Sequence, residues 1–184
     1  MFGRLVGQMA RRRNTFRLAG PCAFIVALPF LAVGVGAGAA AESLPGTVTN
    51  YPATIRRPSG IAAGPDGAMW FTNYGNNSIG RITTAGTVTN YTGTGIDGPF
   101  GIAAGPDGAL WFTSTANRSI GRITTAGTVT VYSGTGIDYP GGVTAGPDGA
   151  LWFTNRGNNS IGRITPAGTV TNYTGPEIDP DGIA

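Results

Sequence analysis

The side chains of this sequence that could do chemistry are carboxylates, amides and arginines, because the chain contains no histidine and no lysine. An imidazole base, a lysine Schiff base and a P-loop are therefore excluded. The single cysteine, Cys22, excludes a disulfide framework and a cysteine-cluster zinc site. One aspartate recurs in an Ile-Asp step, and carboxylates that converge on one face can hold a cation. The candidate metal residues are Asp97, Asp138 and Asp179, with the alternative that each caps its own turn.

A second set of candidates lies where otherwise similar repeats differ. A site for an asymmetric small molecule or extracellular ligand uses side chains that are not repeated. The variable positions of this chain are rich in asparagine, arginine and aromatic residues, which bind by hydrogen bonds, charge and ring contacts. The alternative is that exposed loops simply vary. The candidate binding residues are Asn73, Tyr74, Asn76, Asn77, Phe100, Asn117, Arg118, Arg156, Asn158 and Asn159.

Internal repeats must position these side chains. The turn Pro65-Asp66-Gly67 returns at Pro106 and Pro147, a period of 41 residues, and residues 60–97 match 101–138 at 31 of 38 positions. A period of about 40–45 residues with several short strands is the length of a propeller blade. The competing architecture is a β-solenoid, whose turns are usually shorter.

Each repeat divides into four short strands at turn signals. In the first repeat they cover 60–64, 68–72, 78–83 and 87–92, which are rich in β-branched and aromatic residues. The end of the second strand and the start of the first lie at the same edge of an antiparallel blade, so the variable positions are expected on one face. Residues repeated in every blade are predicted to be core tryptophans, paired arginines and turn aspartates: Trp70, Trp111, Trp152, Arg81, Arg122, Arg163, Asp66, Asp107 and Asp148.

The predicted fold class is all-β, a partial β-propeller of four-stranded blades within residues 42–184. The blades cover about 60–100, 101–141 and 142–181, after an orphan strand at 46–51. Residues 182–184 open a further first strand. An open arc leaves apolar faces in water, at a cost of ~1.5–3 kcal/mol for each large side chain. We therefore expect self-association that completes the ring.

Residues 1–41 have the features of an export signal. Basic residues Arg11–Arg17 precede an apolar run, which ends in the small-residue cleavage pattern Ala39-Ala40-Ala41. The remaining chain has seven arginines against nine acidic residues, so no nucleic-acid partner is expected. The predicted location is secreted, periplasmic or extracellular, without membrane contact after cleavage. The alternative is an uncleaved membrane anchor.

Three segments carry a resemblance to a known family. Residues 101–113 (GIAAGPDGALWFT), 119–124 (SIGRIT) and 127–130 (GTVT) are similar to the blade motif of the streptogramin B lyases, the virginiamycin B lyase family. The similarity covers nearly all of residues 46–184. It implies a seven-bladed propeller that opens a cyclic depsipeptide by elimination. It also implies a magnesium cofactor if that activity holds.

The catalytic positions of that family are occupied differently here. Its histidine takes the variable place of a Pro-x-Gly-Ile motif, and its glutamate follows Trp-Phe-Thr. No catalytic residue carries over, so we expect a lyase-like secreted propeller that is not catalytic as this chain. The alternative is a non-catalytic extracellular propeller that binds a ligand or protein; a lactonase-like hydrolase is the third hypothesis. In this chain the histidine place holds Ser59, Phe100, Gly141 and Asp181. The glutamate place holds Asn73, Ser114 and Asn155.

Overall fold

The computed structural model describes residues 48–51, 54–175, 178 and 180–183. The predicted export signal and the candidate Asp179 lie outside the described residues. Within these ranges, no helix is long and apolar enough to cross a membrane.

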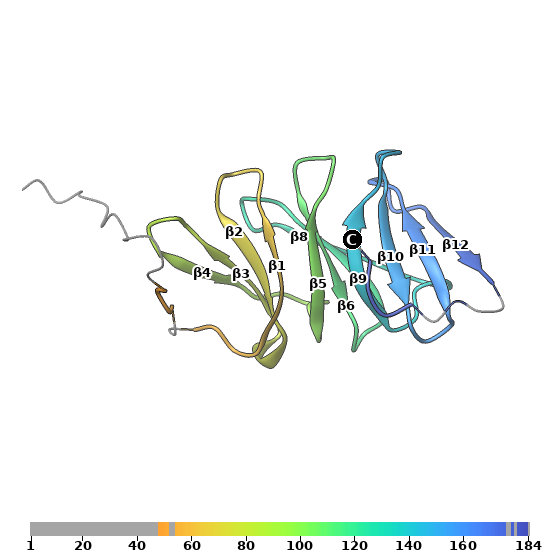
Figure 1. The fold of residues 1–184 in the computed structure, drawn as a ribbon, viewed down its shortest axis with the longest axis horizontal. Helices are drawn as coiled ribbons and strands as arrows, with labels where there is room; N and C mark the ends of the chain where they lie inside the picture. Colours follow the sequence, from red (N-terminus) through yellow and green to blue (C-terminus); the bar gives the residue numbers. More distant parts are fainter. Residues whose placement is uncertain (1–47, 52–53, 176–177, 179, 184) are drawn as a thin grey trace, which may run out of the picture. The chain divides into compact units, whose positions relative to one another are not determined.

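The described residues form three antiparallel sheets of four strands each, and Figure 1 shows them one after another along the chain. We call these sheets blades 1, 2 and 3. Within each, every strand pairs with the next one in sequence. Blade 1 contains β1 (Pro58–Ala63), β2 (Met69–Asn73), β3 (Ser78–Ile82) and β4 (Val88–Tyr91), with the short 3-10 helix η1 (Tyr74–Asn76) between β2 and β3.

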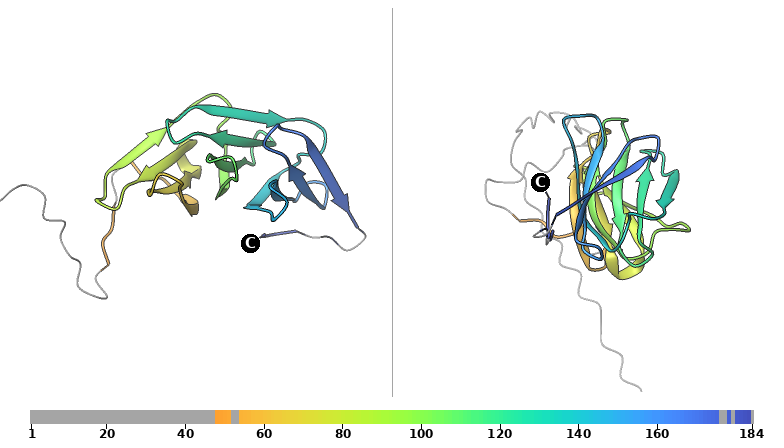
Figure 2. Two further views of the ribbon diagram at one scale, coloured as in Figure 1. Left: turned by 90° about the horizontal axis from the view of Figure 1, so that it is seen from above. Right: turned by 90° about the vertical axis from the view of Figure 1, so that its right-hand side faces the viewer.

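Blades 2 and 3 repeat this order. Blade 2 contains β5 (Pro99–Ala104), β6 (Leu110–Ser114), β7 (Ser119–Ile123) and β8 (Val129–Ser133). Blade 3 contains β9 (Pro140–Ala145), β10 (Leu151–Asn155), β11 (Ser160–Ile164) and β12 (Val170–Thr174). The first strands β1, β5 and β9 are neighbours, and β4, β8 and β12 form the outer edge of each sheet (Figure 2). The predicted partial β-propeller is confirmed.

The core lies between neighbouring blades, because both faces of a middle sheet are covered. Trp70 and Ile79 of blade 1 share one cluster of buried residues with Leu110 and Phe112 of blade 2. Trp111 of blade 2 and the residues around Leu151 and Phe153 of blade 3 form the next cluster. Trp70 and Trp111 are fully buried, as predicted for core residues. The equivalent Trp152 is only partly buried, since no described sheet covers its face of blade 3.

The repeated Asp, Trp and Arg residues form one structural unit in every blade. In blade 1, Trp70 Nε1 donates to Asp66 Oδ1 at 2.9 Å, and Arg81 Nε donates to Asp66 Oδ2 at 2.6 Å. Tyr91 stacks on Trp70 with ring centroids 5.3 Å apart. Burial raises the pKa of Asp66, but the hydrogen bonds from Trp70 and Arg81 outweigh it and hold the pKa below its ordinary value. The predicted pairing of the repeated arginines is confirmed.

Exposure of the outward face of blade 1 shows what a neighbouring blade contributes. Ile61 is 64% exposed, while its counterparts Ile102 and Val143 are both 7% exposed. Met69 is 38% exposed, while its counterpart Leu110 is fully buried. The sequence pattern is the same, so the difference comes from packing alone. This apolar face of blade 1 is open in the described part of the chain.

Described residues before and after the three blades occupy repeat positions, although none of these described residues belongs to a sheet. Tyr51 lies against Gly86, as Tyr91 lies against Gly127. Tyr51 therefore takes the place of an outer-strand residue of a preceding blade, which agrees with the predicted orphan strand. At the other end, Ile183 lies against Gly142 and takes the place expected in the first strand of a following blade.

Candidate functional site

A bulge in the first strand of each blade shapes the site. In blade 1, Pro58 pairs with Asn73 and Ile61 with Phe71, so Ser59 and Gly60 together face the single residue Thr72. The same shift occurs in β5 and in β9. A bulge changes the direction of a side chain, and here it affects the variable residue of the Pro-x-Gly-Ile motif.

A buried threonine holds each bulge, and in blades 1 and 2 it also joins the bulge to the next blade. Thr72 Oγ1 accepts from Gly60 N at 2.8 Å and donates to the Phe100 carbonyl of β5 at 2.7 Å. A Cβ on Gly60 would lie 2.7 Å from that same carbonyl oxygen, so only glycine lets the two first strands approach this closely. The hydrogen bond fixes the spacing of blades 1 and 2 at the bulge.

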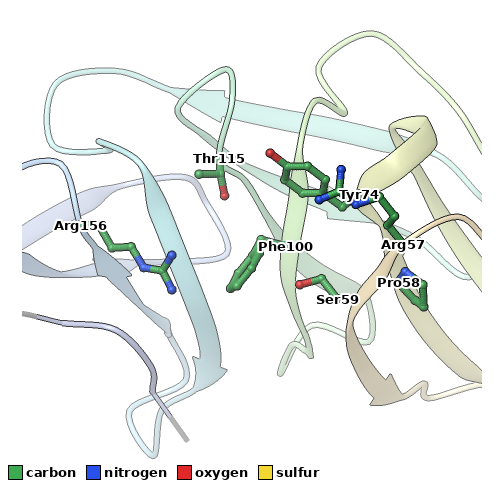
Figure 3. Close-up of a pocket in the computed structure, with 7 residues that line it drawn as sticks. All are labelled: Arg57, Pro58, Ser59, Tyr74, Phe100, Thr115 and Arg156. Atoms are coloured by element: carbon green, nitrogen blue, oxygen red, sulfur yellow. The ribbon is translucent and has the colours of Figure 1, made fainter.

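The bulged residues and the following loops enclose a cavity of about 370 Å³ (Figure 3). Pockets of ~300–1,000 Å³ are typical of small-molecule sites. The lining comes from all three blades and from the segment before β1. Its residues are Arg57, Pro58, Ser59, Tyr74, Phe100, Thr115 and Arg156.

Two arginines in the lining are held on aromatic rings. The guanidinium carbon of Arg57 lies 5.2 Å from the centre of the Tyr74 ring, and that of Arg156 lies 5.1 Å from the centre of the Phe100 ring. A cation over an aromatic face is stabilised by the ring quadrupole. Arg57 lies immediately before Pro58, where β1 begins, and its backbone is left-handed with φ of 47°. The cavity can bind an anion, a ring or both.

The ten predicted binding residues fall into three groups. Tyr74, Phe100 and Arg156 line the cavity just described. A second, more open depression beside blades 2 and 3 is lined in part by Asn117, Arg118 and Asn158. Neither lining includes the remaining four, which are Asn73, Asn76, Asn77 and Asn159.

Asparagines outside the two depressions have structural contacts. Asn73 is fully buried, accepts from Arg56 N at 3.2 Å and donates to Ser78 Oγ at 3.1 Å. Asn77 has a left-handed backbone with φ of 52° and accepts from Gly98 N at 3.0 Å. These amides hold the loops that surround the site. They are binding candidates only in the sense that they shape its rim.

The two candidate carboxylates that the structure describes, Asp97 and Asp138, have separate partners. Asp97 accepts from Asn77 Nδ2 at 2.8 Å, and Asp138 pairs with Arg118 at 3.3 Å. Each aspartate is thus held by a loop of the preceding blade. In the described ranges no group of three or more acidic, cysteine or histidine side chains could hold a metal ion. The printed contacts of Asp97 and Asp138 join them to a loop of the preceding blade and do not cap their own turns, and the magnesium site stays a prediction.

The positions aligned with the family's catalytic residues have two different environments. Ser59 and Phe100, at the histidine position, line the cavity. Asn73, Ser114 and Asn155, at the glutamate position, are fully buried. Asn155 Nδ2 donates to the Gly136 carbonyl at 2.8 Å, so it supports the backbone and does not face the cavity.

Sequence reasoning missed Arg57, Pro58, Ser59 and Thr115 as lining residues. Arg57 and Pro58 precede residue 60, where the sequence match between repeats was started. The sequence feature that could have found them is the proline at the start of each first strand. Arg57 precedes that proline as Gly98 and Tyr139 do, and all three residues have positive φ. Thr115 belongs to the variable loop after β6, and its hydroxyl donates to the Pro140 carbonyl at 2.8 Å.

The fold and the site define a β-propeller of four-stranded blades with a ligand-sized cavity on the face where the first strands begin. A family model described as the virginiamycin B lyase family matches residues 35–184. This chain belongs to the virginiamycin B lyase family. A comparison with curated protein sequences gives no match.

Solved lyases of the family are similar in sequence and structure. Virginiamycin B lyase from Staphylococcus aureus has 43% identity and a TM-score of 0.65, over 69% of this chain and 45% of that one. A streptogramin B lyase structure has 42% identity and a TM-score of 0.68, over 74% of this chain and 48% of that one. A catalytically inactive variant of the Staphylococcus aureus enzyme with quinupristin has 42% identity and a TM-score of 0.65, over 68% and 44% of the two chains. The chain spans less than half the length of these relatives.

Proposed function

We propose that this chain supplies the ligand-binding face of a secreted, lyase-type propeller, and that its ligand is a cyclic depsipeptide of the streptogramin B class. The whole family activity, elimination that opens the depsipeptide ring, is proposed for a propeller that includes these blades. The three blades themselves would bind and orient the ligand. They would not remove its proton, since no described residue at the cavity is a suitable base.

The observation that carries this proposal is the position of the cavity. It lies at the bulges of the Pro-x-Gly-Ile motifs, where Ser59 and Phe100 occupy the place of the family's catalytic histidine. A related lyase is known with quinupristin, a depsipeptide of this class. The ring of Phe100 and that of Tyr74 offer apolar contact area, while Ser59 and Thr115 offer hydroxyls for the peptide groups.

Binding of quinupristin to the purified chain tests the proposal, measured by isothermal titration calorimetry. We expect Phe100→Ala to weaken binding about tenfold, because a buried ring contact worth ~1.4 kcal/mol corresponds to one decade in affinity. Tyr139→Ala is the matched control. Tyr139 is an exposed aromatic residue outside the cavity lining, held under Arg118 at 4.5 Å. Absence of binding, or equal losses in both variants, would contradict the proposal.

Chromatography and mass spectrometry of the same mixture test catalysis. Elimination changes the retention time of the depsipeptide and leaves its mass unchanged, whereas hydrolysis adds one water. We expect neither product with this chain alone.

The second candidate function is a non-catalytic extracellular binding propeller. It is favoured by the glutamate-position residues Asn73 and Asn155, which are buried in hydrogen bonds to their own blades. Binding of quinupristin without conversion supports the first proposal in its non-catalytic form. Failure to bind quinupristin, with a folded chain, supports a propeller for another ligand.

A further inference from the structure

The cavity has an unbalanced charge. Its lining includes two guanidinium groups, Arg57 and Arg156, and no carboxylate. The second depression differs, because its lining contains one arginine and one aspartate, Arg118 and Asp138, which pair at 3.3 Å. The excess of positive charge is therefore specific to the first cavity.

Contact with the aromatic rings leaves the donors of Arg57 available, whereas Arg156 Nη2 already donates to the Asp181 carbonyl at 3.2 Å. The cation–π contacts of Arg57 with Tyr74 and of Arg156 with Phe100 involve the flat face of the guanidinium. The N–H donors lie in the guanidinium plane and match a carboxylate or phosphate. The ion pairs among the described residues involve Arg81, Arg118, Arg122, Arg156 and Arg163, and so do not include Arg57.

One acidic residue stands beside Arg156. Asp181 Oδ1 lies 3.3 Å from Arg156 Nε, and the side chain of Asp181 is 95% exposed. An ion pair this exposed contributes little because water screens it. The donors of Arg156 are shared with Asp181, so Arg57 is the better placed of the two guanidinium groups to bind a ligand anion.

We propose that this cavity selects ligands in which a carboxylate is joined to an aromatic or other flat apolar ring. The carboxylate binds Arg57, and the ring packs on Phe100, Tyr74 and Pro58; Arg156 lies on the other side of the Phe100 ring (Figure 3). The inference rests on the proposed function in taking the cavity as a ligand site. It adds a charge requirement: a depsipeptide ring closed by an ester has no carboxylate at that bond, and the elimination that opens the ring leaves one, so the requirement favours the ring-opened form.

A matched pair of small probes tests the charge requirement. Hydrocinnamate and hydrocinnamide share the same ring and length and differ only in the carboxylate. We expect hydrocinnamate to bind the purified chain about tenfold tighter by NMR titration, because hydrogen bonds to charged groups are stronger than neutral ones by ~1.4 kcal/mol. Higher salt concentration should weaken the binding of hydrocinnamate and leave the binding of hydrocinnamide unchanged.

Three single variants locate the effect. Arg57→Gln should weaken the binding of hydrocinnamate about fivefold to tenfold and leave that of hydrocinnamide unchanged, and Arg156→Gln should weaken it less, because Arg156 already contacts Asp181. Arg118→Gln is the control, because Arg118 also has positive φ and also lies over an aromatic ring, that of Tyr139, yet is outside the cavity lining. Far-UV circular dichroism and a thermal melt establish that each variant is folded.

Equal affinity for the acid and the amide would overturn the inference, as would equal losses in all three variants. The two proposals fail separately. Binding of hydrocinnamate without quinupristin refutes the depsipeptide ligand and keeps the charge requirement. Binding of quinupristin, with equal affinity for hydrocinnamate and hydrocinnamide, keeps the depsipeptide ligand and refutes the charge requirement.

Discussion

Thr113 joins blades 2 and 3, and its replacement by valine should destabilise the protein strongly for so small a change. The side chain is fully buried. Its hydroxyl accepts from Gly101 N at 2.8 Å and donates to the Gly141 carbonyl at 2.7 Å. Valine has nearly the same shape, so Thr113→Val removes both hydrogen bonds without leaving a cavity.

The expected loss follows from the two backbone groups left without partners. A buried donor or acceptor that loses its hydrogen bond costs ~1–3 kcal/mol. Gly101 N is part-buried and the Gly141 carbonyl is buried, so each group should cost an amount in the lower or middle part of that range. The expected loss in the free energy of unfolding is about 2–4 kcal/mol for the two groups together. This is a large fraction of the ~5–15 kcal/mol by which a domain is stable.

Urea unfolding followed by far-UV circular dichroism measures the loss. Thr130→Val is the matched control, because Thr130 lies on the exposed face of β8 in the same blade, and its change should be within about 0.5 kcal/mol. A loss below about 0.5 kcal/mol for Thr113→Val would refute the claim that this hydroxyl fixes the spacing of the blades. The variant should also weaken ligand binding, since Phe100 and Arg156 approach the cavity from the two blades that Thr113 joins.

Three further predictions concern charge, the open face and export. Hydrogen bonds from Trp152 and Arg163 lower the pKa of Asp148 from 3.8 to about 2. The ionised carboxylate therefore stabilises the fold above pH 3.8, and this stabilisation is lost as the pH falls toward 2. The melting temperature should fall over this pH range, and it should fall less in Asp148→Asn. Ile61→Lys should reduce self-association in analytical ultracentrifugation without unfolding the chain, whereas Ile102→Lys should unfold it, because Ile61 is 64% exposed and Ile102 is 7% exposed. N-terminal sequencing of the exported protein should begin at Glu42, and an intact N-terminus would favour a membrane anchor instead.

Local sequence determined the blade and its internal contacts. Asp66 and Trp70 are four residues apart, and Asp66 and Arg81 are fifteen apart, so their hydrogen bonds form within one small sheet. Repetition shows which residues are scaffold, and alternating turns and β-rich runs show where strands begin and end. The strands, the core tryptophans and the pairing of the arginines could therefore be predicted from the repeats, whereas the structure showed that the turn aspartate is the partner of both.

The tertiary structure decided which variable residues form a site. Tyr74, Phe100 and Arg156 lie on three different blades, and they meet because buried hydroxyls such as that of Thr72 bring neighbouring first strands together. The bulge that exposes Ser59 and Phe100 depends on a register shift that no residue pattern shows. Asn73 and Tyr74 are adjacent in sequence, yet one is fully buried and the other is 40% exposed. Burial and the approach of one blade to the next depend on contacts between residues far apart in the chain. Local strand and turn propensities therefore do not predict which residues meet at the cavity.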